Sequence, residues 1–396
     1  MTRPRTGRRR VRPTTYAGPV SDTRPPRRRS SGWVIGRVAG APIILAPSWL
    51  LAAVVLTLLF APTVRSWSPG LGGRVYAVAL VFVVLLFASV LVHELAHGLV
   101  ARARGQQPQE FVLTLLGGHT SFGVAAPTAG TNALVAVAGP VANLVLGGAF
   151  LAAANAVGTG SLLGLMLFAG AFSNGFVGVF NLLPGLPLDG GAVLQSAVWA
   201  ATGNRHTGTV VAAWCGRVVA VGVFAWAFVL PFAQGRQPQL TDAVWGALIG
   251  AFLWTGASGA MRGARTQDAV DRLTVETVGH RAAAVGHTDS VAHASSVAAA
   301  AGADEVVVLA PDGRPAAYVD RAAAAGVPAH AAGTTPVTSV AVTLPVGSVV
   351  DGALTGRDLL DAVGRAAQHS PVVVAVTDGR VVGLVRVADV VAALRT

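Results

Sequence analysis

Two histidines and a glutamate with the spacing of a zinc-binding helix lie at positions 93–97, where the sequence reads His93-Glu94-Leu95-Ala96-His97. Residues four apart share one face of a helix, so His93 and His97 can present two imidazole nitrogens to one metal ion. Glu94 can then reach a water bound to that ion. In a chain of this composition, roughly 0.002 such matches are expected by chance. We interpret the two histidines as metal ligands and Glu94 as a general base.

A catalytic zinc site needs a third protein ligand, and three side chains are candidates. Asp189 lies between two prolines and two glycines at the end of an apolar stretch, where a metal would stabilise a charge that is costly to bury. His119, in a Gly-Gly-His-Thr turn, and Glu110, after a charged loop, are the alternatives. The single cysteine, Cys215, excludes a cysteine-based zinc site and an intrachain disulfide. Asp189 is the favoured third ligand.

Three other polar side chains stand within or at the end of apolar stretches. Asn143 and Asn181 can satisfy broken backbone nearby, or they can donate to an oxyanion or hold a peptide substrate. Arg217 can pair with a carboxylate of the bundle or extend to the membrane boundary. The residues alone do not choose between these roles.

The elements that must position these side chains are membrane helices. The chain has 396 residues, of which 53% are hydrophobic and 12% are charged, and its mean hydropathy of +0.60 is too high for an ordinary soluble protein. We expect an all-α bundle of about six spans with a short β segment at membrane depth over 110–127, where an apolar run is broken by glycines. The expected spans are 43–61, 75–100, 133–157, 162–183, 210–231 and 241–260.

The charge of the chain is concentrated at its N-terminus. Residues 1–30 hold ten arginines and one acid, which supplies +9 of the net +11. We expect residues 1–32 to be a disordered cytosolic tail that contacts anionic lipid and does not bind nucleic acid. We do not interpret this tail as a secretory signal. If the tail is cytosolic, the short loops that join the spans place five arginines on the cytosolic side of the membrane and three on the opposite side. Both termini are therefore expected in the cytosol of a multi-pass protein, and His97 and Asp189 approach the cytosolic side.

A second domain follows the expected membrane domain over 33–262. Within residues 263–396 the apolar runs shorten, and the stretch 305–319 resembles 371–385. Each stretch reads as strand, Asp-Gly turn and strand, followed by an Ala-rich helical segment. An internal repeat of about 60 residues is typical of an α/β domain pair.

Together and in this order, the motifs of the membrane domain resemble the site-2 protease family of intramembrane zinc metalloproteases. They are H-E-x-x-H at 93–97, Gly117-Gly118, Ala138-Gly139-Pro140 with Asn143, and N-x-x-P-x-x-P-L-D-G over 181–190. The resemblance covers about residues 40–260. Two positions depart from the family pattern: His119 follows the Gly-Gly pair, and Thr131-Asn132 replace an acidic residue.

The resemblance implies an activity and a set of roles. It implies that His93, His97 and Asp189 bind one zinc ion per chain, that Glu94 activates water and that Asn181 assists in the site. Gly117-Gly118 would belong to a strand that receives an unwound substrate. Apart from the resemblance, the place of Asn143 in an apolar span leads us to assign it to the same substrate. The implied activity is regulated intramembrane proteolysis in a bacterial plasma membrane, and the implied substrates are single-span proteins such as anti-sigma factors.

The C-terminal repeat is similar to cystathionine-β-synthase-type (CBS) domains, as in one bacterial branch of that family. Gly383-Leu384-Val385-Arg386-Val387-Ala388-Asp389 is close to the CBS pattern, in which a hydroxyl residue and an Asp hold an adenosine nucleotide. Arg386 stands in place of the hydroxyl residue. The resemblance implies a regulatory module, an adenine nucleotide as its ligand and a homodimer formed through it.

Two other classes of function remain open at this stage. A metal-dependent transporter would also place His, Asp and Asn inside a membrane, and it predicts inverted repeats between the two halves. A metal sensor without turnover would use the same ligands, with the C-terminal repeat as its output. The metal content of the purified protein distinguishes a protease from a transporter. A cleavage assay distinguishes a protease from a metal sensor.

Overall fold

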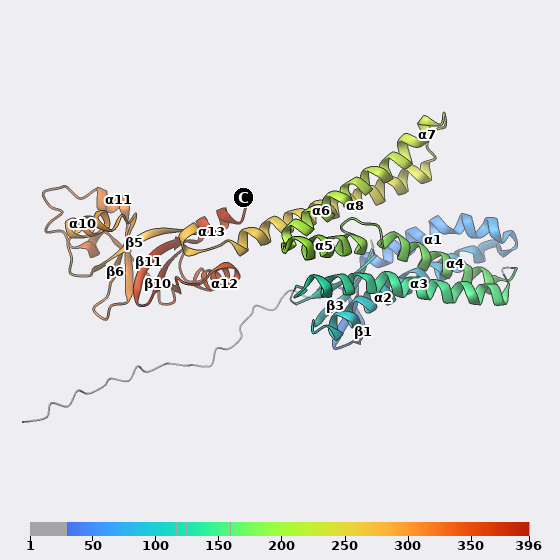
Figure 1. Ribbon diagram of the computed structural model, residues 1–396, viewed down its shortest axis with the longest axis horizontal. Helices are drawn as coiled ribbons and strands as arrows, with labels where there is room; N and C mark the ends of the chain where they lie inside the picture. The colour runs from blue at the N-terminus through green and yellow to red at the C-terminus, as the bar shows by residue number, and fades with distance from the viewer. Residues whose placement is uncertain (1–29, 116, 124, 159, 396) are drawn as a thin grey trace, which may run out of the picture.

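The computed structural model describes residues 30–115, 117–123, 125–158 and 160–395 (Figure 1). The arginine-rich tail before residue 30 lies outside these ranges, so its contact with anionic lipid stays a prediction. A bundle of long helices and a separate mixed sheet are the two main parts, and α8 (Leu240–Asp271) runs from one to the other (Figure 1). The domain boundary expected at 262 falls inside this continuous helix.

Among the described residues, six helical segments are long and apolar enough to cross a membrane, which is the number predicted. They comprise α1 (Ser48–Trp67), α2 (Val75–Ala103), α3 (Ala129–Val157), α4 (Leu162–Asn181), α6 (Arg205–Phe224), which continues through a π-helical turn into α7 (Leu230–Ala233), and α8. Large apolar side chains such as Val145, Phe172 and Val218 are exposed on their outer faces. That pattern is expected where lipid covers the surface in place of protein.

The β segment expected over 110–127 corresponds to two strands, β3 and β4, of a four-stranded sheet in the order β1-β2-β3-β4. Its strands are β1 (Trp33–Val38), β2 (Ala41–Leu45), β3 (Pro108–Thr114) and β4 (Gly117–Phe122). β2 pairs with β3 in parallel, and β3 pairs with β4 antiparallel. β4 therefore forms one edge of the sheet.

The start of the first span was predicted wrongly. Residues 43–45 belong to β2, and α1 begins only at Ser48, after the helix-capping position of Pro47. The β1–β2 hairpin turns at Ala39 and Gly40, both with positive φ. Because the apolar residues of β2 run directly into those of α1, hydropathy alone does not separate a strand from the helix that follows it.

A short helix that the sequence analysis did not predict presents Asp189. The chain leaves α4, crosses an irregular segment over 182–188, and begins α5 (Asp189–Thr202) at Asp189 itself. The irregular segment is held by α6, because Leu186 N–H donates to the carbonyl of Ala212 at 3.0 Å. Gly216 allows the close approach, since a Cβ there would lie 1.9 Å from the Leu186 oxygen.

The C-terminal part is a seven-stranded mixed sheet in the order β8-β7-β6-β5-β11-β10-β9. Its elements are α9 (Val275–Val278), β5 (Gly279–Gly286), α10 (Val291–Ala301), β6 (Glu305–Leu309), β7 (Pro315–Val319), α11 (Arg321–Ala325), β8 (Ala341–Thr343), β9 (Val349–Asp351), α12 (Gly356–Ala366), β10 (Val372–Thr377), β11 (Arg380–Arg386) and α13 (Val387–Ala393). The two predicted hairpins are β6–β7 and β10–β11. Each follows a strand and a helix, with the first strand parallel to the second. Membership of the CBS family stays a prediction.

A buried carboxylate joins the two halves of this sheet. Glu305, at the start of β6, is 1% exposed, and its Oε1 accepts a hydrogen bond of 2.7 Å from Nη2 of Arg386 at the end of β11. Arg321 lies farther away, at 3.9 Å. A buried charge needs such a partner because its hydration has been lost.

Replacing Arg386 by Met is expected to destabilise the C-terminal sheet by about 3 kcal/mol, because the carboxylate of Glu305 then stays buried without its close partner. In the full chain, amide hydrogen exchange of β6 and β11 should accelerate by about two orders of magnitude. The matched control is the double variant Glu305→Gln with Arg386→Met, which removes both charges and should recover most of the protection. Equal acceleration in both variants would show that the ion pair is not the cause.

Candidate metal centre

The structure brings the three favoured ligands into contact. Asp189 Oδ2 lies 2.9 Å from His93 Nε2 and 3.3 Å from His97 Nε2. Both imidazoles are buried, and the Asp189 carboxyl is about one-fifth exposed. In the described ranges these three residues form the group whose ligand atoms could hold one metal ion.

A chain of amides fixes the tautomer of His93. Asn174 Nδ2 donates to the carbonyl of Gly170, so the oxygen of the Asn174 amide faces Asn143 and accepts from its Nδ2 at 2.8 Å. The Asn143 oxygen therefore faces His93 Nδ1 at 2.5 Å, and that nitrogen must carry the proton. His93 Nε2 is left with its lone pair directed toward Asp189.

His97 has the same tautomer for a simpler reason. Its Nδ1 lies 2.6 Å from the carbonyl oxygen of Val135 on α3, and a carbonyl can only accept. Nε2 of the neutral ring therefore also presents a lone pair. Hydrogen bonding of the distal nitrogen to a carbonyl or an amide oxygen is the usual way in which a metal-binding histidine is oriented.

These contacts fit a zinc ion. Two nitrogen lone pairs and a carboxylate oxygen converge, and Asp189 Oδ2 is buried without a hydrogen-bond partner. The two lone pairs and the carboxylate oxygen repel one another unless a positive charge lies among them. Ligands bound to a tetrahedral zinc at 2.0–2.2 Å lie about 3.3–3.6 Å apart. The 3.3 Å separation of Asp189 and His97 agrees with this range, and the 2.9 Å separation of Asp189 and His93 is somewhat shorter.

A glycine of α3 makes room for the two imidazoles. A Cβ at Gly139 would lie 2.5 Å from His97 Nε2 and 2.7 Å from His93 Nε2. Real Cβ atoms do not come so close, so any larger residue would displace the ligand atoms themselves. The Ala-Gly-Pro motif therefore has a steric reason at its central position.

Glu94 lies beside the metal ligands but is not one of the group. It is buried, and its Oε2 accepts a 2.7 Å hydrogen bond from Thr120 Oγ1, which also lies 3.1 Å from the Glu94 carbonyl oxygen. Gly118 is in contact with the same side chain, because a Cβ there would lie 2.6 Å from Glu94 Cγ. β4 thus packs its Gly118 and Thr120 positions on the proposed base. The role of Thr120 was not predicted from the sequence, although its position two residues after Gly118 places its hydroxyl on the same face of the strand.

Replacing Thr120 by Val should slow catalysis about tenfold while zinc content stays unchanged, because the Glu94 carboxylate loses the hydrogen bond that orients it. Zinc analysis and a cleavage assay on the same preparation measure both quantities. Thr114→Val is the matched control, since the Thr114 hydroxyl donates to the carbonyl of Gly117 and not to Glu94. A loss of zinc in Thr120→Val would instead indicate a disturbed metal centre.

The two alternative third ligands lie elsewhere. His119 is exposed, and strand alternation directs it to the opposite face of β4 from Gly118 and Thr120. Glu110 accepts a 2.7 Å hydrogen bond from Ser30 Oγ, three residues before β1. Asp189 is therefore the one of the three candidates that reaches His93 and His97 in the described structure.

The predicted substrate and catalytic amides have different surroundings. Asn143 is fully buried behind His93, so here it orients a ligand and does not face a substrate. Asn174, also fully buried, completes that network and was missed by sequence analysis. Asn181 Nδ2 donates to the Val177 carbonyl within its own helix, and its part in catalysis stays a prediction. Gly117, with φ of 123°, begins β4.

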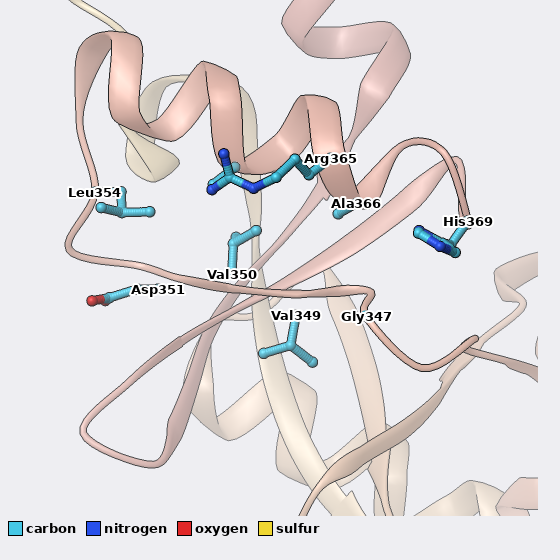
Figure 2. A pocket seen from close by; sticks show the side chains of 9 residues that line it. Gly347, Val349, Val350, Asp351, Leu354, Arg365, Ala366 and His369 are labelled. Carbon is cyan, nitrogen blue, oxygen red and sulfur yellow. The ribbon is translucent and has the colours of Figure 1, made fainter. Parts of the chain in front are cut away.

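A cavity of about 410 Å³ lies in the C-terminal sheet, between α12 and β9 (Figure 2). Figure 2 shows Arg365 on the helix above, Val350 rising toward it from β9, and His369 to one side. The motif compared with nucleotide-binding CBS domains does not line this cavity. In that motif Arg386 is paired with Glu305, and Asp389 Oδ2 lies 3.1 Å from His280 Nε2.

The fold and the site define an integral membrane protein in which two histidines of the transmembrane helix α2 and an aspartate at the start of α5 form a candidate metal centre. Residues 81–164 and 154–225 match the model of peptidase family M50. Residues 81–225 of this chain are thus similar to that family, the site-2 protease family. Every residue of the metal centre falls within the matched range.

Two curated relatives are provisionally named zinc metalloproteases. One, from Synechocystis sp., is 34% identical over 255 residues, which cover 61% of this chain and 63% of the relative. The other, Rip3 of Mycobacterium tuberculosis, is 35% identical over 236 residues, covering 56% and 57%. This chain thus spans about three-fifths of their length. A solved site-2 protease from Methanocaldococcus jannaschii matches 58% of this chain and 95% of its own, with 24% identity and a TM-score of 0.43.

Proposed function

We propose that this protein is a zinc metalloprotease that hydrolyses peptide bonds in or near transmembrane segments of membrane-anchored proteins. The observation that carries the proposal is the convergence of His93, His97 and Asp189, with Glu94 buried beside them. Hydrogen bonds at Nδ1 orient the two histidines, and Asp189 is the first residue of α5. The match of residues 81–225 to the family model and the names of the relatives support the same activity.

Within this proposal each residue has one task. A zinc ion held by His93, His97 and Asp189 supplies Lewis acidity, which acidifies water and polarises a peptide carbonyl. Glu94 accepts the proton of the attacking water on its carboxylate and delivers it to the leaving amine. Thr120 holds that carboxylate in place through its hydroxyl. Gly139 leaves the ligand nitrogens accessible by having no side chain.

The edge of the small sheet suggests how a substrate is presented. A peptide bond in a helix is shielded, and in a membrane an unwound segment needs partners for its backbone groups. β4 lies at the edge of the sheet and packs on Glu94, so a substrate strand added to it would bring its carbonyls to the site. We propose single-span regulators such as anti-sigma factors as the substrates, and Gly117 and Gly118 as the positions that admit the strand.

Several further expectations belong to this proposal. They are a bacterial plasma membrane with both termini in the cytosol, a regulatory CBS-like pair that takes an adenine nucleotide or forms a homodimer, and a tail that contacts anionic lipid. Asp389, the motif residue that such a nucleotide would need, already lies 3.1 Å from His280, so a nucleotide would have to displace that contact.

Metal analysis of the purified full chain tests the proposal. The wild-type protein should carry about one zinc per chain. Asp189→Ala should lose it, whereas Asp242→Ala, which removes an exposed carboxylate in the first turn of α8, should retain it. A wild-type protein without zinc favours the transporter. One that binds zinc but produces no fragments from co-expressed single-span proteins favours the metal sensor.

A further inference from the structure

A charged side chain on the bundle has no acidic partner. Arg217 lies on α6 inside a segment long and apolar enough to cross a membrane. Its Nη2 donates to Ser258 Oγ on α8 at 3.1 Å, and its Nε is buried without a hydrogen-bond partner. Among the described residues no carboxylate forms an ion pair with it. A cation without an anionic partner is costly within or at the edge of a membrane span, which points to an anion from outside the chain.

Two tryptophans flank this guanidinium and face outward. The carbon of the Arg217 guanidinium lies 5.0 Å from the ring centre of Trp214 and 5.1 Å from that of Trp254. The two indoles are 55% and 45% exposed. Indole rings stabilise the cation through their π faces, and tryptophans of this kind concentrate at the boundary between hydrocarbon and headgroups.

The lengths of the two helices place Arg217 at that boundary. From Arg217 to Gln234 the helix rises about 26 Å, and from Leu240 to Ser258 it rises about 27 Å. A hydrocarbon core is about 30 Å thick. With the turn between α7 and α8 at one boundary, Arg217 and Ser258 therefore reach the other.

The same end of the hairpin carries further positive charge. His206 Nδ1 lies 3.1 Å from the Ala264 carbonyl oxygen, so the start of α6 is level with that turn of α8. Arg205, Arg262 and Arg265 lie at this level, beyond Arg217 along the hairpin. A negative group at the membrane boundary would be attracted to this end.

We propose that α6 and α8 bind the phosphate of a glycerophospholipid from the surrounding bilayer at Arg217. The guanidinium has five N–H donors, of which Ser258 takes one, and its planar shape suits a phosphate. The hydroxyl of Ser258 can donate to a second phosphate oxygen. The rings of Trp214 and Trp254 lie beside the glycerol and the first part of the acyl chains.

The proposed lipid site adjoins the segment that presents Asp189. Gly216, next to Arg217, packs on Leu186, and a Cβ at Gly256 on α8 would lie 2.4 Å from Pro187 Cγ. Both helices therefore support the irregular segment within one turn of the residues that would hold the phosphate. A bound lipid would bridge α6 and α8 at that level.

Native mass spectrometry of the full chain tests the site with dioleoyl phosphatidylglycerol as the probe. Arg217→Gln keeps a polar side chain but removes the charge, and it should weaken binding of this lipid about tenfold or more, because a charge-assisted hydrogen bond to the phosphate is lost. Arg236→Gln removes an arginine at the far end of the same hairpin and should leave binding within about twofold. Dioleoylglycerol, which has the same chains without phosphate, should not bind at this site. Equal binding to wild type and Arg217→Gln would overturn the proposal.

A second measurement covers the case in which Arg217→Gln does not fold. A phosphatidylglycerol with a photoreactive group near the glycerol should label wild-type peptides that contain Trp214 or Trp254. Labelling confined to other helices would overturn the proposal, as would displacement of the lipid by an acidic single-span peptide at equal concentration, which would identify a protein carboxylate as the preferred partner. Loss of zinc in Asp189→Ala should not alter the labelling, so this result is independent of the proposed protease activity.

Discussion

Replacing Glu94 by Gln is expected to abolish peptide cleavage and to leave the zinc in place. Glutamine keeps the size of the side chain and can still bond to Thr120, but it cannot take the proton of the attacking water. The rate should fall by at least about 10²-fold to 10⁴-fold, the usual contribution of a general base. Fragments of co-expressed single-span proteins and the zinc content of the purified variant measure the two effects.

Glu110→Gln is the matched control for this substitution. Glu110 lies in the same small sheet, on β3, but it bonds to Ser30 and not to the metal centre. Its replacement should leave both cleavage and zinc unchanged. Cleavage retained by Glu94→Gln would contradict the assignment of the base, and zinc lost from it would indicate that Glu94 is a ligand.

Replacing Gly139 by Ala is expected to empty the metal centre with one added methyl group. That carbon would lie 2.5 Å and 2.7 Å from the two nitrogens proposed as ligands, closer than any real Cβ contact. The imidazoles must turn away, so we expect zinc affinity to fall by at least about 10-fold to 100-fold, as when an orienting contact of a ligand is lost. A competitive chelator titration of the purified protein measures this loss.

Gly148→Ala separates this effect from a general disturbance of α3. Gly148 lies on the same helix, and a Cβ there would meet nothing within 4 Å. This control should keep its zinc and gain slightly in helix stability, because alanine is the better helix former. Unchanged zinc affinity in Gly139→Ala would mean that α3 can move away from α2, and that the close packing does not define the centre.

The ligands could be predicted from sequence because local rules determine them. His93 and His97 share a helix face by spacing alone. Asp189 could be predicted because a lone carboxylate on proline- and glycine-broken backbone at the end of a span needs a compensating charge. Six spans followed from the lengths of the apolar runs, and all six are present among the described residues.

The supporting contacts could not be predicted in the same way, because they depend on tertiary structure. Asn174 is 31 positions from Asn143 and Thr120 is 26 from Glu94, so only packing of α4 and β4 on α2 and α3 reveals their partners. The β1–β2 hairpin was missed because apolar residues continue without a break from strand into helix. Arg217 was left open between two roles, and the absence of a carboxylate in the described structure decides against one of them.

The unbroken path of α8 has a mechanical consequence. This helix of 32 residues is about 48 Å long and stiff on that scale. Near its middle Gly256 presses on Pro187, two positions before Asp189, and at its far end Gly356 of α12 donates to the Leu273 carbonyl at 2.7 Å. A movement of the C-terminal sheet would therefore be transmitted along this stiff helix to the segment that holds the third ligand. A tilt of the helix by a few degrees at one end would shift the other end by ångströms.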